Sequence, residues 1–165
     1  IGESPQPTNE QFENDLGDAW MGLDHTKPIW LEDESPSIGS VFVPQKLYQQ
    51  MSLATVARLE MSKPLRVKRL IKDYASYPKE LLIASIKKIE KRLGGLQAKT
   101  SIQAIEQDDF GTAIDIVLDY YDKAYTYDLG KRKPEQFLHL ETATDDAAEN
   151  AKLVLEFIHA NEIKQ

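Results

Sequence analysis

TVARLEMSKPLRVKRLIKDY, residues 55–74, contains the pattern on which the predicted fold depends. Residues 55–60 favour a short strand. Pro64 follows, and proline suits the first turn of a helix because the amide hydrogens of that turn have no partner within the helix. A helix over residues 65–74 is therefore predicted directly after the strand. This succession is the building unit of α/β domains.

The rest of the chain continues the alternation. A capping box that begins at Thr8 predicts a helix to about Gly22, and apolar residues at helical spacing predict another from Lys79 to Gly94. Further predicted elements are strands over residues 29–31 and 137–141, and a second short strand or extended loop over 38–43. A short helix is predicted around Tyr48, followed by helices over 100–107 and 110–121 and a final helix capped by Thr144. This order predicts one α/β domain over residues 1–165, with a mainly parallel sheet and a helical insertion at about 64–122.

The composition is typical of a globular domain. Of the 165 residues, 41% are hydrophobic and 28% are charged. The absence of cysteine excludes a disulfide framework, a thiolate zinc site and a cysteine nucleophile, and the three histidines lie too far apart in sequence to predict a metal site. No stretch approaches the roughly 18 apolar residues of a membrane span, so we expect a cytoplasmic protein with no membrane partner. Since the chain starts at Ile1, we expect a fragment of a longer protein.

The net charge of −7 conceals a basic block in the middle of the chain. Residues 58–99 hold 12 basic and 4 acidic side chains, whereas residues 1–57 have a net charge of −7 and residues 100–165 one of −8. Such a block attracts phosphates, with a strength that falls as salt rises. The alternative is a set of solvated helix faces without a ligand. The candidate tRNA-binding or phosphate-binding residues are Arg58, Arg66, Lys68, Arg69, Lys72, Lys87, Lys88, Lys91 and Arg92.

Within this block, Arg66 and Arg69 are the best-placed candidates. They are three residues apart, so a helix presents both on one face, and each guanidinium can bind phosphate oxygens through two hydrogen bonds. The alternative for Arg58, Arg66, Lys68 and Arg69 is that they are surface residues that pair with acids such as Glu60 and Asp73.

An acidic group follows the predicted strand over residues 29–31. Glu32, Asp33 and Glu34 would then lie at the carboxyl end of a strand, where phosphate-handling domains hold Mg²⁺ or orient a nucleophile. An acidic turn without any ligand has the same sequence.

A tyrosine cluster forms the third candidate group. Tyr120, Tyr121 and Tyr125 are of the residue type that stacks on unpaired bases, although helix-end tyrosines more often serve packing.

The chain contains no GxxxxGK followed by Ser or Thr, no GxSxG, no HExxH and no GxGxxG. We therefore identify no catalytic residue and expect no cofactor held by this chain alone.

Several stretches together resemble the bacterial tRNA 2-selenouridine synthase family. These stretches are QPTNEQFE at residues 6–13, PIWLEDES at 28–35, IG at 38–39, KRLGG at 91–95 and LDYYDKAY at 118–125, and WLEDES and LDYYDKAY are the most specific. They occur in the order found in the family. The resemblance runs through nearly the whole chain.

The resemblance implies a fold and an activity. Members join a rhodanese-like domain, which carries an essential cysteine, to a P-loop domain, and this chain is similar to the part of the P-loop domain that follows the Gly-rich loop. The implied fold is a partial, P-loop-NTPase-like three-layer domain with a basic helical insertion. The family enzyme replaces the sulfur of wobble 2-thiouridine in tRNA with selenium from selenophosphate, through a geranylated intermediate. The implied partners are the anticodon region of tRNA and the rhodanese-like domain, and this chain alone is expected to be inactive.

Two other functions fit the residues themselves. The chain could belong to a P-loop kinase or ATPase that acts on a small phosphorylated substrate, in which case it would bind an Mg-nucleotide once the upstream loop is present. It could also be a non-catalytic interaction module that uses its basic helices for assembly, in which case it would show no preference for tRNA over other polyanions.

Overall fold

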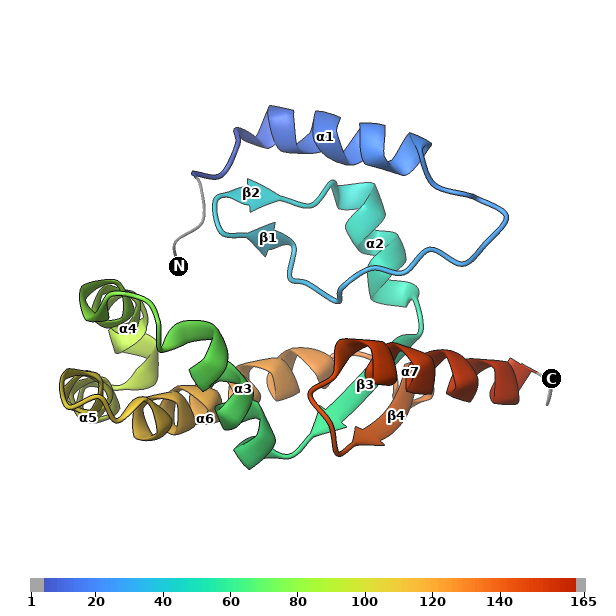
Figure 1. The fold of residues 1–165 in the computed structure, drawn as a ribbon. Coiled ribbons are helices and arrows are strands. Elements are labelled where there is room, and N and C mark those ends of the chain that lie inside the picture. Colours follow the sequence, from blue (N-terminus) through green and yellow to red (C-terminus); the bar gives the residue numbers. More distant parts are fainter. Residues whose placement is uncertain (1–4, 163–165) are drawn as a thin grey trace. The chain divides into compact units, whose positions relative to one another are not determined.

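The computed structural model describes residues 5–162, with side chains described up to Ala160 (Figure 1). The described chain forms two compact units, the first ending at Val56 and the second beginning at Ala57. Each unit is described by itself.

The first unit is small and has little buried core. It consists of α1 (Asn9–Met21), a hairpin of β1 (Ser37–Ile38) and β2 (Val41–Phe42), and α2 (Gln45–Leu53). The predicted cap is confirmed, because the Thr8 side chain accepts a hydrogen bond from the Gln11 amide at 3.2 Å. Among residues 5–56, only Val41 is buried.

One strand prediction in this unit is wrong, and a second one holds only in part. Residues 29–31 form no strand, and the side chains of Trp30 and Leu31 are 53% and 45% exposed. Residues 38–43 form no single strand, because the chain reverses at Gly39 into the β1–β2 hairpin. Gly39 has a φ of 63°, a conformation that glycine adopts without the steric cost of a Cβ atom. The Gln6 side chain stabilises this turn with two hydrogen bonds. It accepts one from the Ser40 amide and donates one to the Ile38 carbonyl.

The second unit confirms the α/β class with a small parallel sheet. The strands β3 (Val56–Met61) and β4 (Phe137–Thr142) lie next to each other in a two-stranded sheet, and both arrows point the same way in Figure 1. Both strands were predicted. Four helices lie between them in sequence, namely α3 (Lys63–Tyr74), α4 (Lys79–Leu93), α5 (Gly95–Glu106) and α6 (Phe110–Leu129). A short 3-10 turn (Pro134–Gln136) precedes β4, and α7 (Ala147–Glu162) follows it.

The core of this unit lies between α4, α5 and α6. Its buried residues are Leu82, Ile86, Ala98, Ala104, Ile105 and Ala113. Three of these six are alanines, which let the helix backbones approach closely. The core thus holds the helical part of the unit together, and these helices position the site described below.

Three helix boundaries differ from the prediction. Helix α5 begins at Gly95 rather than near residue 100, because Gly94 turns the chain directly out of α4 with a φ of 95°. Helix α6 continues to Leu129, since no glycine or proline occurs between its predicted end at Tyr121 and Gly130. Helix α7 is capped by Asp146 and not by Thr144, because the Asp146 carboxylate accepts from the amides two and three residues ahead, each at 2.9 Å. No helix in the described part of the chain is long and apolar enough to cross a membrane.

Candidate functional site

The first half of α3 is joined to α6 by ion pairs. Lys63 Nζ lies 2.8 Å from a carboxylate oxygen of Asp115 and 2.7 Å from one of Asp119. Arg66 donates two parallel hydrogen bonds to Asp122, at 2.6 and 2.8 Å. These bonds from Arg66 hold the pKa of the Asp122 carboxyl below its ordinary value, against the opposing effect of burial. Arg66 therefore has a structural partner in the folded chain.

The second half of α3 is joined to the loop before α7. Arg69 pairs with Asp73 through Nε at 2.9 Å and donates to the backbone carbonyl of Asp145 at 3.1 Å. Lys72 donates to the Asp145 carboxylate at 3.0 Å, and this bond lowers the pKa of Asp145. Because acids neutralise both Arg69 and Lys72, much of the positive charge predicted for α3 is already compensated.

Arg58 on β3 follows the same pattern. Its Nε lies 3.1 Å from a carboxylate oxygen of Glu60, the same carboxylate that lies 3.4 Å from Nδ1 of His139 on β4. This group is half exposed and bridges the two strands of the sheet.

Helix α4 carries the positive charge that the fold does not compensate. Lys87, Lys88, Lys91 and Arg92 are all exposed, and none of them forms an ion pair within residues 5–162. Lys68, on α3, is also exposed and has no ion pair there. Of the nine basic candidates, these five therefore remain able to bind an external anion without first breaking an ion pair of the protein.

An apolar pocket of about 600 Å³ lies next to this basic helix. Helices α3, α4, α5 and α6 all contribute to its wall. Its apolar lining consists of Leu70, Leu82, Ile86, Ile89, Ile105, Phe110, Ala113, Ile114, Val117 and Leu118, and its polar or aromatic lining of Arg66, Tyr74, Ser85, Tyr121, Asp122 and Tyr125. An apolar cavity with a few converging polar groups is the usual form of a ligand site.

Exposed tyrosines mark the solvent side of the pocket. Tyr74, Tyr121 and Tyr125 line it and remain 39%, 41% and 55% exposed, and the ring centroids of Tyr121 and Tyr125 are 6.4 Å apart. Burial raises the pKa of the Tyr121 phenol, Tyr120 and Tyr74 add to the rise, and the positive charge of Arg92 opposes it. Arg92 therefore lies near enough to Tyr121 to act on it electrostatically.

Not all predicted tyrosines belong to this pocket. Tyr120 does not line it, although its ring centroid is 5.0 Å from that of Tyr121 in an edge-on arrangement. Tyr121 and Tyr125 are four residues apart and share one face of α6. The structure thus brings together two of the three tyrosines with Arg66 from the basic set.

The acidic group lies in the first unit and not at the end of a strand. Glu32, Asp33 and Glu34 belong to an extended loop in which the Glu34 amide donates to the Glu32 carbonyl at 2.9 Å. The premise of a carboxylate at the carboxyl end of a strand is therefore not met. Among the described residues, no group of three His, Asp or Glu side chains is placed to hold a metal ion.

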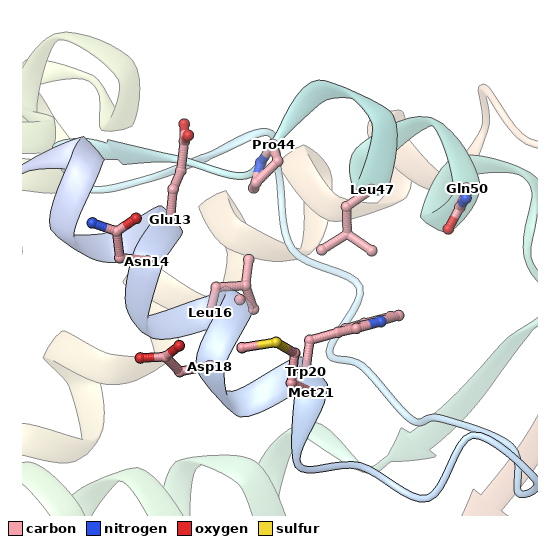
Figure 2. Close-up of a pocket in the computed structure, with 10 residues that line it drawn as sticks. Glu13, Asn14, Leu16, Asp18, Trp20, Met21, Pro44, Leu47 and Gln50 are labelled. Atoms are coloured by element: carbon pink, nitrogen blue, oxygen red, sulfur yellow. The ribbon is translucent and has the colours of Figure 1, made fainter.

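A second, shallower groove lies in the first unit between α1 and α2 (Figure 2). Leu16 and Trp20 of α1 and Leu47 of α2 form its apolar part, and Glu13 and Asp18 flank it. Its volume is about 840 Å³. Because its charged flanks are acidic, this groove is unsuited to a phosphate-bearing ligand.

Comparison with known proteins supplies the family. The sequence model of the family described as "tRNA 2-selenouridine synthase AAA domain" matches residues 2–156, which is nearly all of the chain. The chain belongs to this family. The α/β fold with its small parallel sheet is thus the structure of a tRNA 2-selenouridine synthase AAA domain.

Curated relatives agree with this assignment. The tRNA 2-selenouridine synthase of Marinobacter nauticus is 31% identical over 163 residues, which cover 80% of this chain and 44% of the relative. Those of Shewanella denitrificans and Shewanella pealeana are 32% and 35% identical, covering 78% and 77% of this chain and 44% and 43% of the relatives. The chain therefore spans less than half the length of these relatives. No solved structure matches it.

Reasoning from the sequence missed two parts of the site in this AAA domain. The first is the acidic stripe of α6, formed by Asp115, Asp119 and Asp122, which receives the cations of α3. These three aspartates are four and three residues apart in the sequence, a spacing that places them on one face of a helix and could have predicted the stripe. The second is the pocket itself, which depends on how four helices pack and has no local signal.

Proposed function

We propose that this chain is the part of a tRNA 2-selenouridine synthase that binds and positions tRNA. The whole enzyme would replace the sulfur of a wobble 2-thiouridine with selenium from selenophosphate. The observation that carries the proposal is the group of four uncompensated cations on α4, next to a tyrosine-lined pocket in a member of this family. Folded RNA is held largely through its phosphates, for which lysine and arginine are the natural ligands.

The paired cations of α3 have a different part in this proposal. Arg58, Arg66, Arg69 and Lys72 would contribute to the local potential but would contact phosphate only by exchanging one of their carboxylate partners. The strongest phosphate contacts are therefore assigned to Lys87, Lys88, Lys91 and Arg92, with Lys68 as a further exposed cation.

Other parts of the whole protein are needed for the chemistry. The chain has no cysteine and no Gly-rich phosphate-binding loop. We infer that a rhodanese-like domain supplies the cysteine, that the loop completes a P-loop-like three-layer domain, and that this chain alone is inactive. In the whole enzyme, selenophosphate would bind as the selenium donor. This role does not depend on whether an Mg-nucleotide also binds. Because the substrate would be tRNA, the protein would act in the cytoplasm.

A charge-matched pair of variants tests the proposal. In the first variant, Lys87, Lys88, Lys91 and Arg92 are all changed to Gln. In the control, Lys27, Lys46, Lys123 and Lys152, which are also exposed, are changed to Gln, so that the net charge falls equally. The α4 variant is expected to lower tRNA affinity and to reduce the slope of log affinity against log salt by about 1 for each lost phosphate contact.

The control is expected to retain most of the affinity and the salt slope of the unmodified chain. Filter binding or fluorescence anisotropy over a salt series measures both quantities. Equal losses in the two variants would show that only net charge matters, and the assignment of the tRNA surface to α4 would then be wrong.

A further inference from the structure

We propose that the pocket formed by α3, α4, α5 and α6 receives one base turned out of the bound RNA, with Tyr121 and Tyr125 stacking on it at the mouth. This inference rests on the proposed function and adds a base subsite to the phosphate-binding surface.

The pocket has the size and the lining of a small-ligand site. Its volume is about 600 Å³, and the buried side chains of Leu82, Ile86 and Leu118 belong to its wall, so it reaches the core of the unit. An apolar pocket with a few converging polar groups is the default place to expect a ligand. A planar group with apolar faces, such as a base, would remove this surface from water.

The mouth has the chemistry that recognises a base. Tyrosine rings stack on bases of any sequence, and Tyr74, Tyr121 and Tyr125 offer three partly exposed rings there. Arg66 and Asp122 add hydrogen-bond donors and acceptors for the edge of a base. The Nε atom of Arg66 is buried and has no hydrogen-bond partner among the described residues, so a small shift of the pair would let it donate to a base carbonyl.

The uncompensated cations lie beside this mouth. Ser85, Lys88 and Arg92 are three and four residues apart on α4, so they follow one flank of the helix, and Ser85 lines the pocket. Arg92 also acts electrostatically on Tyr121. A backbone held by Lys88 and Arg92 would therefore pass the opening of the pocket, and single-stranded loops are the RNA segments whose bases can be turned out.

The inference is tested by cross-linking this chain to an anticodon stem-loop RNA that carries 4-thiouridine at the wobble position. After irradiation, mass spectrometry locates the adduct. The expected adduct lies on Tyr74, Tyr121, Tyr125 or a neighbouring residue of the pocket wall. A matched RNA with 4-thiouridine in the stem is expected to give no adduct there.

Two exposed tyrosines of α6 provide matched variants. Tyr125 lines the pocket and is 55% exposed, whereas Tyr127 does not line it and is 72% exposed. Tyr125→Ala is expected to weaken binding of the stem-loop about 5-fold or more, the usual effect of losing one stacked base. Tyr127→Ala is expected to change it by less than about twofold. Tyr121→Leu, which keeps an apolar side chain at a partly buried position, is expected to behave like Tyr125→Ala.

The outcomes separate this inference from the proposed function. If the RNA does not bind, or binds equally well to the α4 variant, the proposed function fails and the base subsite fails with it. If binding requires α4 but the adduct lies outside the pocket and the Tyr125→Ala and Tyr121→Leu variants bind normally, only the base subsite is overturned.

Discussion

Arg66 and Asp122 hold two helices together and also line the pocket. The two residues are 56 positions apart in the sequence, and their two hydrogen bonds join α3 to α6 at the wall of the pocket. The Arg66 side chain is 31% exposed and that of Asp122 is 41% exposed, so water screens much of the attraction. The main contribution of the pair is therefore the position that it gives to α3.

This pair makes the stability of the chain depend on pH in a defined direction. The pKa of Asp122 lies below its ordinary value of 3.8 in the folded state, because Arg66 donates to its carboxylate. The folded state thus favours the deprotonated form, and the stabilisation is present above about pH 4 and is lost as pH falls through the lowered pKa. Asp122→Asn should accordingly be less stable than the unmodified chain at neutral pH, with a difference that shrinks on acidification.

Urea unfolding of both proteins, measured from neutral pH down to about pH 3, checks this expectation. A difference in unfolding free energy that stays constant over the whole range would show that the ionised pair contributes nothing.

Helix α5 buries four of its twelve residues between its neighbouring helices. Ala98, Ser101 and Ala104 are buried at spacings of three residues, and they face the helices α4 and α6 that line the pocket. Ser101 is fully buried, and its hydroxyl has no hydrogen-bond partner among the described residues. A buried hydroxyl without a partner carries a desolvation cost.

Ser101→Ala is therefore expected to raise the unfolding free energy by about 1 kcal/mol. Thermal and urea denaturation measure the change. Ser85→Ala serves as the control, because the Ser85 hydroxyl donates to the Leu81 carbonyl at 3.0 Å and its removal should bring no gain. A loss of stability in Ser101→Ala would contradict this account of the α5 packing.

The elements also show which features the sequence could predict. Helices α1 and α4 were predicted because a cap, a periodic apolar face and a terminal glycine are local signals. The strand predicted over residues 29–31 does not form because a strand requires a partner strand. Trp30 and Leu31 have none among the described residues and stay exposed. The basic set stays a prediction as a phosphate-binding surface. Its division into paired α3 cations and uncompensated α4 cations depends on where α6 packs, which no local pattern records.

At the scale of the whole molecule, charge distribution decides what can bind. The chain has a net charge of −7 and would repel a polyanion as a whole. Residues 58–99 nevertheless have a net charge of +8, and the cations without ion pairs concentrate on α4. Attraction to RNA should therefore be local and short-ranged, and it should weaken strongly as salt screens it.

The most direct measurement is a salt-series titration of this chain with a tRNA that contains wobble 2-thiouridine. The same tRNA without the thio modification and a plain duplex RNA are titrated in parallel. We expect the thiolated tRNA to bind more tightly than the duplex and its affinity to fall steeply as the salt concentration rises. Equal binding of all three RNAs, or no binding at low salt, would contradict the claim that this domain recognises and positions tRNA.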